Sequence, residues 1–250
     1  MGGASVTLYA QWEAISACDA TCQALRVGLS AYYPLDTDAN DYSGNDVNLS
    51  VNGAIPATGR VGQSYNLNGS TDYLSSADNS YLDLSGPGRT LSEWFYIDSF
   101  TTQYSPIITK GVYMTVYSSP QAVGYWGVIS QDGGIHFEVS GTDQYPDSYC
   151  GTSGGLVSTG GWNHVTFIWD DAGYLKIYLN GVLRNCSATM QGAWYTGDAS
   201  TNFDFLVGSL PSLGWWTDGK VDEIGIWNRA LSQTEISNLY NGGSGRSLKL

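Results

Sequence analysis

The chain has 250 residues, of which 42% are hydrophobic and 13% are charged. This hydrophobic share suffices for one sizeable core and excludes an intrinsically disordered chain. Ten Lys and Arg against 23 Asp and Glu leave a formal charge of -13. Nucleic acid is therefore not expected as a partner, because both molecules would be negatively charged. The sequence holds no run of about 18 apolar residues, so no membrane insertion is expected.

The first predicted strand spans residues 3–12, where Val6, Leu8, Ala10 and Trp12 alternate with polar residues. A period of two is typical of a strand with one buried face. The segment resembles the closing strand of the Listeria and Bacteroides repeat, a small β module of bacterial surface proteins. The resemblance implies that a β module of a longer surface or secreted protein ends here.

Four cysteines, Cys18, Cys22, Cys150 and Cys186, can pair in three ways. The first two lie close together in sequence, and the other two lie in Gly- and Ser-rich segments that flank a predicted strand pair. We therefore expect the disulfides Cys18–Cys22 and Cys150–Cys186 rather than metal ligation. Disulfides indicate an extracytoplasmic protein.

From residue 31 onward, short alternating runs are separated by turn residues. Asx-Gly dipeptides, which accept positive φ and are typical of hairpins, occur at 52–53, 68–69, 132–133, 180–181 and 218–219. The predicted strands span residues 31–35, 64–67, 71–75, 90–97, 106–110, 112–117, 124–130, 134–139, 162–169, 174–179, 203–208 and 220–227. Short strands at this spacing predict an all-β sandwich or barrel.

One short C-terminal helix is predicted. Residues 232–235 read Ser-Gln-Thr-Glu, which has the form of a capping box, and Ile236, Leu239 and Tyr240 form one apolar stripe before residues 241–243 end the helix. We expect this helix to cover an edge or an end of the sandwich.

A series of short phrases carries a family resemblance over about residues 29–248. The phrases lie, in order, at residues 33–36, 40–45, 65–69, 72–74, 90–94, 107–111, 162–167, 175–181 and 221–232. The series is similar to the laminin G-like, concanavalin A-like jelly-roll domains of bacterial extracellular proteins. We therefore expect residues 29–248 to form this domain, residues 1–28 to hold the end of a preceding module and a linker, and residues 249–250 to lie outside the domain.

The resemblance implies a two-sheet antiparallel jelly-roll sandwich, often with one structural calcium ion. It would bring Asp41, in the Asn-Asp-Tyr-Ser-Gly-Asn turn that ends at Asn45, close to Asp222 in the closing strand. Calcium takes six to eight oxygen ligands. The alternative is that Asp41 forms an Asx turn and that Asp222 simply begins a strand.

Three pairs of neighbouring rings are candidate carbohydrate contacts: Tyr125 and Trp126, Trp194 and Tyr195, and Trp215 and Trp216. Rings stack on sugar faces through apolar contact, while neighbouring polar groups bind the hydroxyls. Adjacent residues of a strand point to opposite faces, so one ring of each pair can be buried. The alternative for each pair is packing in the core or at its rim.

No glycosidase or lyase motif is recognised. Laminarinase relatives of this fold carry a Glu-x-Asp-x-(x)-Glu strand, which this sequence lacks. Alginate-lyase relatives carry Gln-Ile-His with two further motifs, of which this chain has only Gly134-Ile135-His136. We therefore interpret His136 as a strand residue and His164, in a Trp-x-His-Val phrase, as structural.

Glu93 departs from the family pattern, because the family that the sequence resembles usually has a small residue there. Glu93 also shares a predicted strand face with Leu91 and Phe95. A buried carboxylate needs a partner, and Lys110 or Arg89 could supply it. The other possibility is that this face opens to a cleft.

These features predict a noncatalytic carbohydrate-binding module, calcium-stabilised, extracellular or on the cell surface of a bacterium, and a monomeric fragment of a multi-domain protein. Its expected partner is a glycan or a cell-surface polysaccharide. The alternatives are a structural or adhesion module that binds a protein and, second, a polysaccharide-cleaving enzyme.

Overall fold

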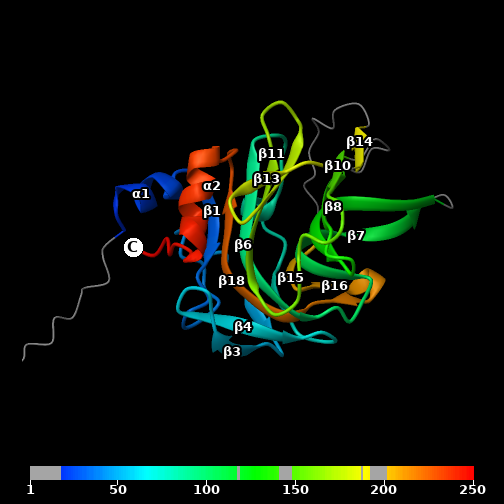
Figure 1. Cartoon of the computed structure of the whole chain (residues 1–250), viewed down its shortest axis with the longest axis horizontal. Coiled ribbons are helices and arrows are strands. Elements are labelled where there is room, and N and C mark those ends of the chain that lie inside the picture. Colours follow the sequence, from blue (N-terminus) through cyan, green and yellow to red (C-terminus); the bar gives the residue numbers. More distant parts are fainter. Residues whose placement is uncertain (1–17, 117–118, 141–147, 187, 192–201) are drawn as a thin grey trace, which may run out of the picture.

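The computed structural model describes residues 18–116, 119–140, 148–186, 188–191 and 202–250. Two large antiparallel sheets lie face to face, which confirms the predicted jelly-roll sandwich (Figure 1). The strand predicted at residues 3–12 lies outside the described residues.

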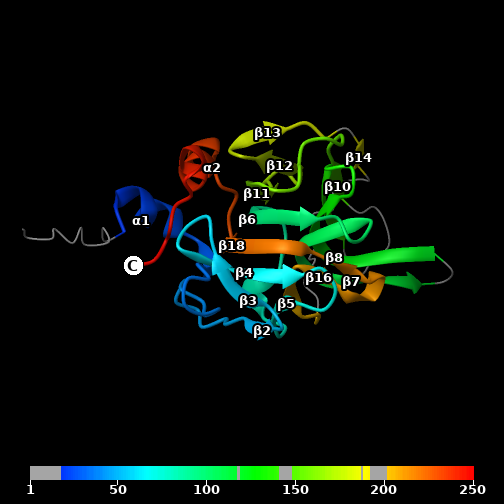
Figure 2. The same cartoon turned by 60° about the horizontal axis from the view of Figure 1, so that its bottom comes forward.

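The first sheet, called sheet A, has the strand order β13-β12-β11-β6-β18-β4-β3, and β1 pairs with the second half of β18. Its strands are β1 (Leu29–Tyr33), β3 (Ile55–Thr58), β4 (Gln63–Asn68), β6 (Arg89–Ser99), β11 (Trp162–Trp169), β12 (Leu175–Leu179), β13 (Val182–Arg184) and β18 (Asp218–Trp227). In Figure 2, β3 and β4 lie beside β18 at one edge of this sheet.

The second sheet, called sheet B, has the order β14-β10-β9-β8-β7-β15-β5-β2. Its strands are β2 (Ser50–Asn52), β5 (Tyr73–Ser76), β7 (Tyr104–Val116), β8 (Ser119–Ser130), β9 (Ile135–Ser140), β10 (Ser148–Gly151), β14 (Ala188–Gln191) and β15 (Phe205–Val207). A two-stranded ribbon joins β16 (Ser209–Leu210) to β17 (Trp215–Trp216). Short 3-10 helices are η1 (Ser80–Leu82), η2 (Pro211–Leu213) and η3 (Asn241–Gly243).

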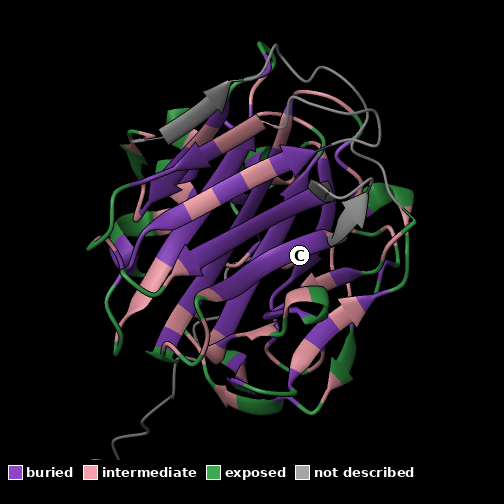
Figure 3. Cartoon of the chain, turned by 90° about the vertical axis from the view of Figure 1, so that its right-hand side faces the viewer, coloured by how far each residue is buried: buried purple, intermediate pink, exposed green. Residues whose placement is uncertain are grey.

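The hydrophobic core lies between the two sheets. The rings of Phe137 in β9 and Phe167 in β11 stack across it with centroids 4.9 Å apart. Buried residues dominate the central strands, and exposed residues gather in the surrounding loops (Figure 3).

A second apolar cluster covers the outer face of sheet A. It joins Leu25 of α1 (Ala20–Arg26) and Ile236 and Leu239 of α2 (Gln233–Tyr240) to Tyr32 and Trp227 of the sheet. Both helices lie on the side of sheet A away from sheet B (Figure 1). Because both faces are covered, β1 and the end of β18 are buried continuously rather than at alternate residues.

Helix α2 confirms the predicted capping box. The Ser232 hydroxyl accepts from the Glu235 N–H, and the Glu235 carboxylate accepts from the Ser232 N–H. Helix α1 was not predicted. It begins after Asp19, whose carboxylate accepts from the Cys22 N–H, and it has only seven residues, too few to show a helical period.

Both predicted disulfides are present. Cys18–Cys22 spans the start of α1, and Cys150–Cys186 joins β10 of sheet B to the segment that follows β13 of sheet A. The Cα atoms lie 5.2 Å apart in each.

The strand prediction missed several short strands, among them β2, β3, β10 and β13, and it divided β7 in two. Residues 106–110 and 112–117 were predicted as separate strands, but β7 runs through Gly111, which pairs with Gly124 of β8. A Cβ at Gly124 would lie 2.0 Å from the Lys110 carbonyl oxygen, so the glycines permit close pairing here rather than a turn.

Only two of the five Asx-Gly dipeptides form hairpins, at 132–133 between β8 and β9 and at 180–181 between β12 and β13. The dipeptides at 52–53 and 68–69 connect strands of different sheets, and residues 218–219 lie inside β18. Positive φ permits any sharp change of chain direction, so the dipeptide alone does not specify a hairpin.

Candidate carbohydrate-binding face

The outer face of sheet B carries a row of rings. Along β8, Tyr125 and Ile129 belong to the core, whereas Trp126 and Val128 form a small cluster with Tyr104 of β7 on the other face. This follows from the alternation of side chains in a strand. The two helices pack on the opposite sheet, so their side chains do not cover these rings.

The row runs across four elements. The rings of Trp215 and Tyr104 have centroids 4.6 Å apart, Tyr104 meets His136 edge-on at 5.5 Å, and His136 stacks with Tyr149 at 5.8 Å. Trp126 is almost fully buried beneath this row, whereas Trp215, Tyr104, His136 and Tyr149 are half-buried. We call Tyr104, Trp126, His136, Tyr149 and Trp215 the aromatic face.

His136 is held on both sides. Its Nδ1 lies 2.5 Å from the Tyr149 hydroxyl, and its Nε2 lies 3.1 Å from the Ser130 hydroxyl. Burial lowers the pKa of His136, although the charge of Asp132 opposes this shift. The imidazole is therefore neutral at pH 7.

The β16–β17 ribbon separates the aromatic face from a groove. Trp215 contacts Tyr104, whereas its neighbour Trp216 contacts Tyr73 of β5, with centroids 6.1 Å apart. Tyr73 also lines an open groove of about 440 Å³. Its other lining residues include Ser75, Asn202, Phe203, Asp204 and Ser212. Rings together with hydroxyl, amide and carboxylate groups match the composition of a sugar site.

The structure places the six predicted sugar contacts in different parts of the molecule. Trp126, Trp215 and Trp216 lie on the outer face of sheet B. Tyr125 does not, because it is fully buried and its hydroxyl donates to the Leu82 carbonyl oxygen at 2.6 Å. Trp194 and Tyr195 lie outside the described residues.

Sequence reasoning missed Tyr73, Tyr104 and Tyr149, and it interpreted His136 only as a strand residue. Tyr104 and Tyr149 stand apart from other rings in the sequence, so the search for adjacent rings passed over them. The alternation of β9, with Ile135 and Phe137 inward, does place His136 on the outer face.

The residues named for calcium already have hydrogen-bonding partners. The Asp41 carboxylate accepts from the backbone N–H groups of Tyr32, Ser43 and Val47 and from the Ser43 hydroxyl. The Asn45 amide donates to the Ser30 carbonyl oxygen.

Asp222 faces a different loop, where its Oδ2 accepts from the N–H groups of Arg60 and Val61. Within the described part of the chain, no group of three or more His, Cys, Asp or Glu side chains could hold a metal ion. The other oxygen of Asp222, Oδ1, is buried and has no hydrogen-bond partner among the described residues, and calcium takes six to eight oxygen ligands. A calcium ion here stays a prediction from the sequence.

Glu93 forms neither of the pairs considered for it. Lys110 instead contacts Asp78 at 2.8 Å and Asp83 at 2.7 Å, and Arg89 bonds to Ser85 and nearby carbonyl oxygens. Glu93 is fully buried, and neither of its oxygens has a hydrogen-bond partner among the residues described. Burial, aided by the nearby charge of Asp222, raises its pKa well above the usual range.

A β-bulge in β18 lies opposite Glu93. Asp222 pairs with Trp94 and Gly225 pairs with Ser92, so β18 has one residue more than β6 over this stretch. Glu223 takes a positive φ of 51° there. The extra residue directs Glu223 to the outer face of sheet A, whereas Ile224 returns to the core.

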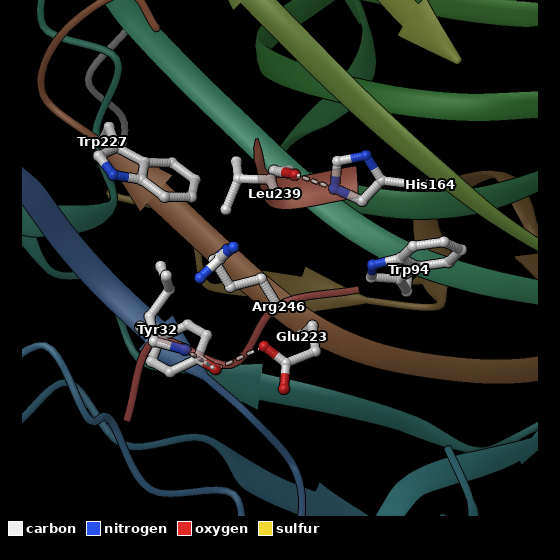
Figure 4. Close-up of a pocket in the computed structure, with 9 residues that line it drawn as sticks. Tyr32, Trp94, His164, Glu223, Trp227, Leu239 and Arg246 are labelled. Carbon is white, nitrogen blue, oxygen red and sulfur yellow. Dashed lines mark hydrogen bonds between the residues drawn. The ribbon is translucent and has the colours of Figure 1, made fainter. Parts of the chain in front are cut away.

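A small polar cavity lies on that outer face beneath α2, and Figure 4 shows its lining. Glu223 contacts Tyr32, and His164 contacts the Ser92 hydroxyl at 2.8 Å. Its volume of about 10 Å³ leaves room for about one water molecule, so a sugar does not fit. Burial lowers the pKa of His164 to about 3, which agrees with its interpretation as a structural residue.

The two antiparallel sheets of this protein share one core, so its fold belongs to the class of jelly-roll sandwiches. Residues 68–237, more than half of the chain, match the sequence profile of the laminin G type in the concanavalin A-like lectin/glucanases superfamily. The chain belongs to this superfamily.

Adhesion G-protein coupled receptor D1 is similar to part of the chain. The Bos taurus receptor is 33% identical over 89 residues, which cover 36% of this chain and 9% of the receptor, and the Homo sapiens receptor is 30% identical over 86 residues, which cover 34% and 10%. The matched segment thus spans about a tenth of the curated relatives.

Several solved structures share the fold. Domain 4 of AbnA, a GH43 extracellular arabinanase from Geobacillus stearothermophilus in complex with arabinotriose, has a TM-score of 0.60 and 21% identity, over 84% of this chain and 97% of that one. The binding domain of Paraclostridial Mosquitocidal Protein 1 has a TM-score of 0.66 and 17% identity, over 88% and 53%.

The ligand binding domain of botulinum neurotoxin serotype D, in complex with N-acetylneuraminic acid, has a TM-score of 0.64 and 17% identity, over 89% and 52%. The solved relatives described here are thus mainly binding domains. At these identities the likeness establishes the fold alone. No helix within the described ranges is long and apolar enough to cross a membrane.

Proposed function

We propose that the chain is a noncatalytic carbohydrate-binding module that binds neutral glycans on the outer face of sheet B. The observation that carries the proposal is the continuous row from Trp215 through Tyr104 and His136 to Tyr149. Half-buried rings offer apolar faces to sugars at little entropic cost, because packing already fixes them. The formal charge of -13 favours neutral over anionic sugars.

The solved relatives support this proposal by analogy, since two of them were determined with a bound sugar. The two disulfides favour an oxidising compartment, and we infer that the module is secreted or held at a cell surface. The partial similarity to adhesion receptors favours a second candidate, an adhesion module that binds a protein partner.

The test measures sugar binding by titration calorimetry with arabinotriose, xylotriose, cellotriose and sialyllactose. We expect a neutral trisaccharide to bind and Trp215→Ala to weaken it at least about tenfold, through loss of apolar burial. Trp162→Ala is the matched control, because Trp162 is also half-buried and packs against Tyr96, but on sheet A.

Three results would contradict the proposal. If none of the four sugars binds, the proposal loses its support. If Trp215→Ala and Trp162→Ala lose the same affinity for sugar, the sugar does not bind at the aromatic face. Release of new reducing ends from a bound sugar would instead identify a glycan-cleaving enzyme.

A further inference from the structure

A chain of hydrogen bonds extends from the β8–β9 turn to the middle of the aromatic face. The Ser130 hydroxyl donates to Oδ1 of Asp132 at 2.5 Å, and the Gly134 N–H donates to the same oxygen at 3.0 Å. These bonds, with the Ser130 contact as the larger cause, lower the pKa of Asp132. Asp132 is therefore a carboxylate at neutral pH and fixes the direction of the Ser130 O–H.

The direction of that O–H determines the tautomer of His136. A serine hydroxyl has one hydrogen, and whether it is donated to Asp132 or to the Gly134 carbonyl oxygen at 3.2 Å, none is left for His136. The contact between Ser130 and Nε2 therefore requires that Nε2 carries the proton. In a neutral imidazole, Nδ1 is then an acceptor.

The acceptor Nδ1 in turn orients Tyr149. The Tyr149 hydroxyl lies 2.5 Å from Nδ1 and must donate to it. Its hydrogen thus points into the protein, and the lone pairs of its oxygen are left for other donors. Tyr149 is half-buried, so this oxygen lies at the edge of the row of rings.

Two glycines leave the space that this chain occupies. A Cβ on Gly151, which pairs with His136 across the strands, would lie 2.4 Å from the Tyr149 hydroxyl and 3.0 Å from Nδ1. A Cβ on Gly134 would lie 2.8 Å from the Ser130 hydroxyl. Any other residue at Gly151 would separate the His136–Tyr149 pair.

We propose that Tyr149, oriented by His136, Ser130 and Asp132, is the specificity-determining residue of the aromatic face and accepts a hydrogen bond from a hydroxyl of a neutral sugar. The proposal rests on the proposed function and adds the polar contact that the rings lack. For this hydrogen bond Ser130 and His136 are positioning residues, because they act on it through Tyr149, although the His136 ring also belongs to the aromatic face.

The arrangement makes this contact depend on pH. Protonated His136 donates from both nitrogens, so the Tyr149 oxygen must accept from Nδ1 and loses a lone pair for the sugar. Within the described residues, the charged and titratable groups around His136 are Asp132 in the turn, Glu138 on β9, Tyr104 on β7 and Tyr149 on β10. Lowering the pH therefore weakens the Tyr149 oxygen as a hydrogen-bond acceptor for the sugar hydroxyl.

The first experiment reads the tautomer without a ligand. The chain has two histidines, so ¹⁵N NMR of histidine-labelled protein resolves two imidazoles, and His164→Gln assigns them. At pH 7.5 we expect His136 to carry its proton on Nε2 and Ser130→Ala to remove this preference. A proton on Nδ1 would overturn the proposed orientation of Tyr149, whatever the protein binds.

The second experiment titrates arabinotriose, xylotriose and cellotriose into wild type and Tyr149→Phe at pH 7.5 and at a lower pH where the NMR signals show His136 protonated. We expect the variant to bind about tenfold more weakly at pH 7.5, the loss of one hydrogen bond. We expect affinity to fall at the lower pH in wild type and not in the variant. Tyr81→Phe, at an exposed tyrosine, is the control and should bind as wild type.

The outcomes separate the two proposals. Equal affinities of Tyr149→Phe and wild type would overturn the role of Tyr149 but leave the proposed function standing. Binding of none of the trisaccharides by wild type would overturn the proposed function and this role with it, while the NMR result would still decide the orientation of the hydroxyl.

Discussion

The Tyr32 hydroxyl donates a hydrogen bond of 2.5 Å to Oε2 of Glu223, although 191 positions separate the two residues. The same hydroxyl accepts from the Leu248 N–H at 2.8 Å. One side chain of β1 thus joins the bulge of β18 to the C-terminal segment, and Figure 4 shows its contact with Glu223. Tyr32 also belongs to the apolar cluster that includes Leu25 of α1 and Leu239 of α2.

Tyr32→Phe is expected to lower the free energy of unfolding by about 2–3 kcal/mol, because it leaves a buried carboxyl and a buried N–H without partners. Urea denaturation measures the change, with the exposed Tyr81→Phe as the control. A loss under about 0.5 kcal/mol, the lower limit for one net hydrogen bond, would show that the contact contributes little.

Because three buried carboxyl groups have raised pKa values, we predict that alkali destabilises the fold. Burial raises the pKa of Asp222 to about 8, although the N–H groups of Val61 and Arg60 oppose it, and burial raises the pKa of Glu223 and Glu93 well above the usual range. A folded-state pKa above the unfolded value gives stability that is present at low pH and lost as the pH rises through the folded pKa.

Above pH 7, His164 is neutral in the folded state and mostly neutral in the unfolded state, so it opposes this trend only weakly. We therefore expect the free energy of unfolding to fall between pH 7 and pH 8, and Asp222→Asn to reduce the slope by about 1 kcal/mol per pH unit. Chemical denaturation at each pH measures the slope. The control is Asp98→Asn at the exposed pair with Lys220, and an unchanged slope in Asp222→Asn would contradict the prediction.

Asp41→Ala is expected to destabilise the fold with or without calcium. Its carboxylate accepts four hydrogen bonds, three of them from backbone N–H groups, and their loss costs about 2–3 kcal/mol. Thermal melting in EDTA and in calcium provides the test. If EDTA lowers the melting temperature of wild type but not of Asp41→Ala, Asp41 is a calcium ligand, as the sequence predicts.

The two disulfides are expected to stabilise the protein unequally. Cys150 and Cys186 are 36 positions apart and join the two sheets, whereas Cys18 and Cys22 are four apart. By chain entropy the longer loop contributes about 4 kcal/mol and the shorter about 2 kcal/mol. Urea denaturation of the two variants, each with both cysteines of one disulfide replaced by serine, measures the loss in free energy of unfolding. An equal loss in both, or a larger loss for Cys18–Cys22, would contradict the entropic account.

Much of the fold follows from local patterns. The alternation of Leu91, Phe95 and Ile97 indicates β6, and Ser232 with Glu235 specifies the start of α2. The β-bulge at Glu223 has no such pattern, because it arises where β18 pairs with β6 and β1 at once.

The candidate site was only partly predictable. Trp126 and Trp215 were identified as neighbours of other rings, but Tyr125 was chosen with them although it is buried. Alternation indicates that adjacent side chains face opposite ways, but it does not say which way faces solvent. The helices α1 and α2 pack on sheet A, so the rings of Trp126 and Tyr104 on the outer face of sheet B are not covered by them.

The sequence by itself determined that this chain forms an antiparallel sandwich, because strand period, capping residues and paired cysteines act over a few neighbours. The tertiary structure decided which groups meet. His136 touches Tyr149 only because β9 and β10 pair in the register that sets Gly151 opposite His136. Such register depends on contacts between segments far apart in the chain, so local composition does not encode it.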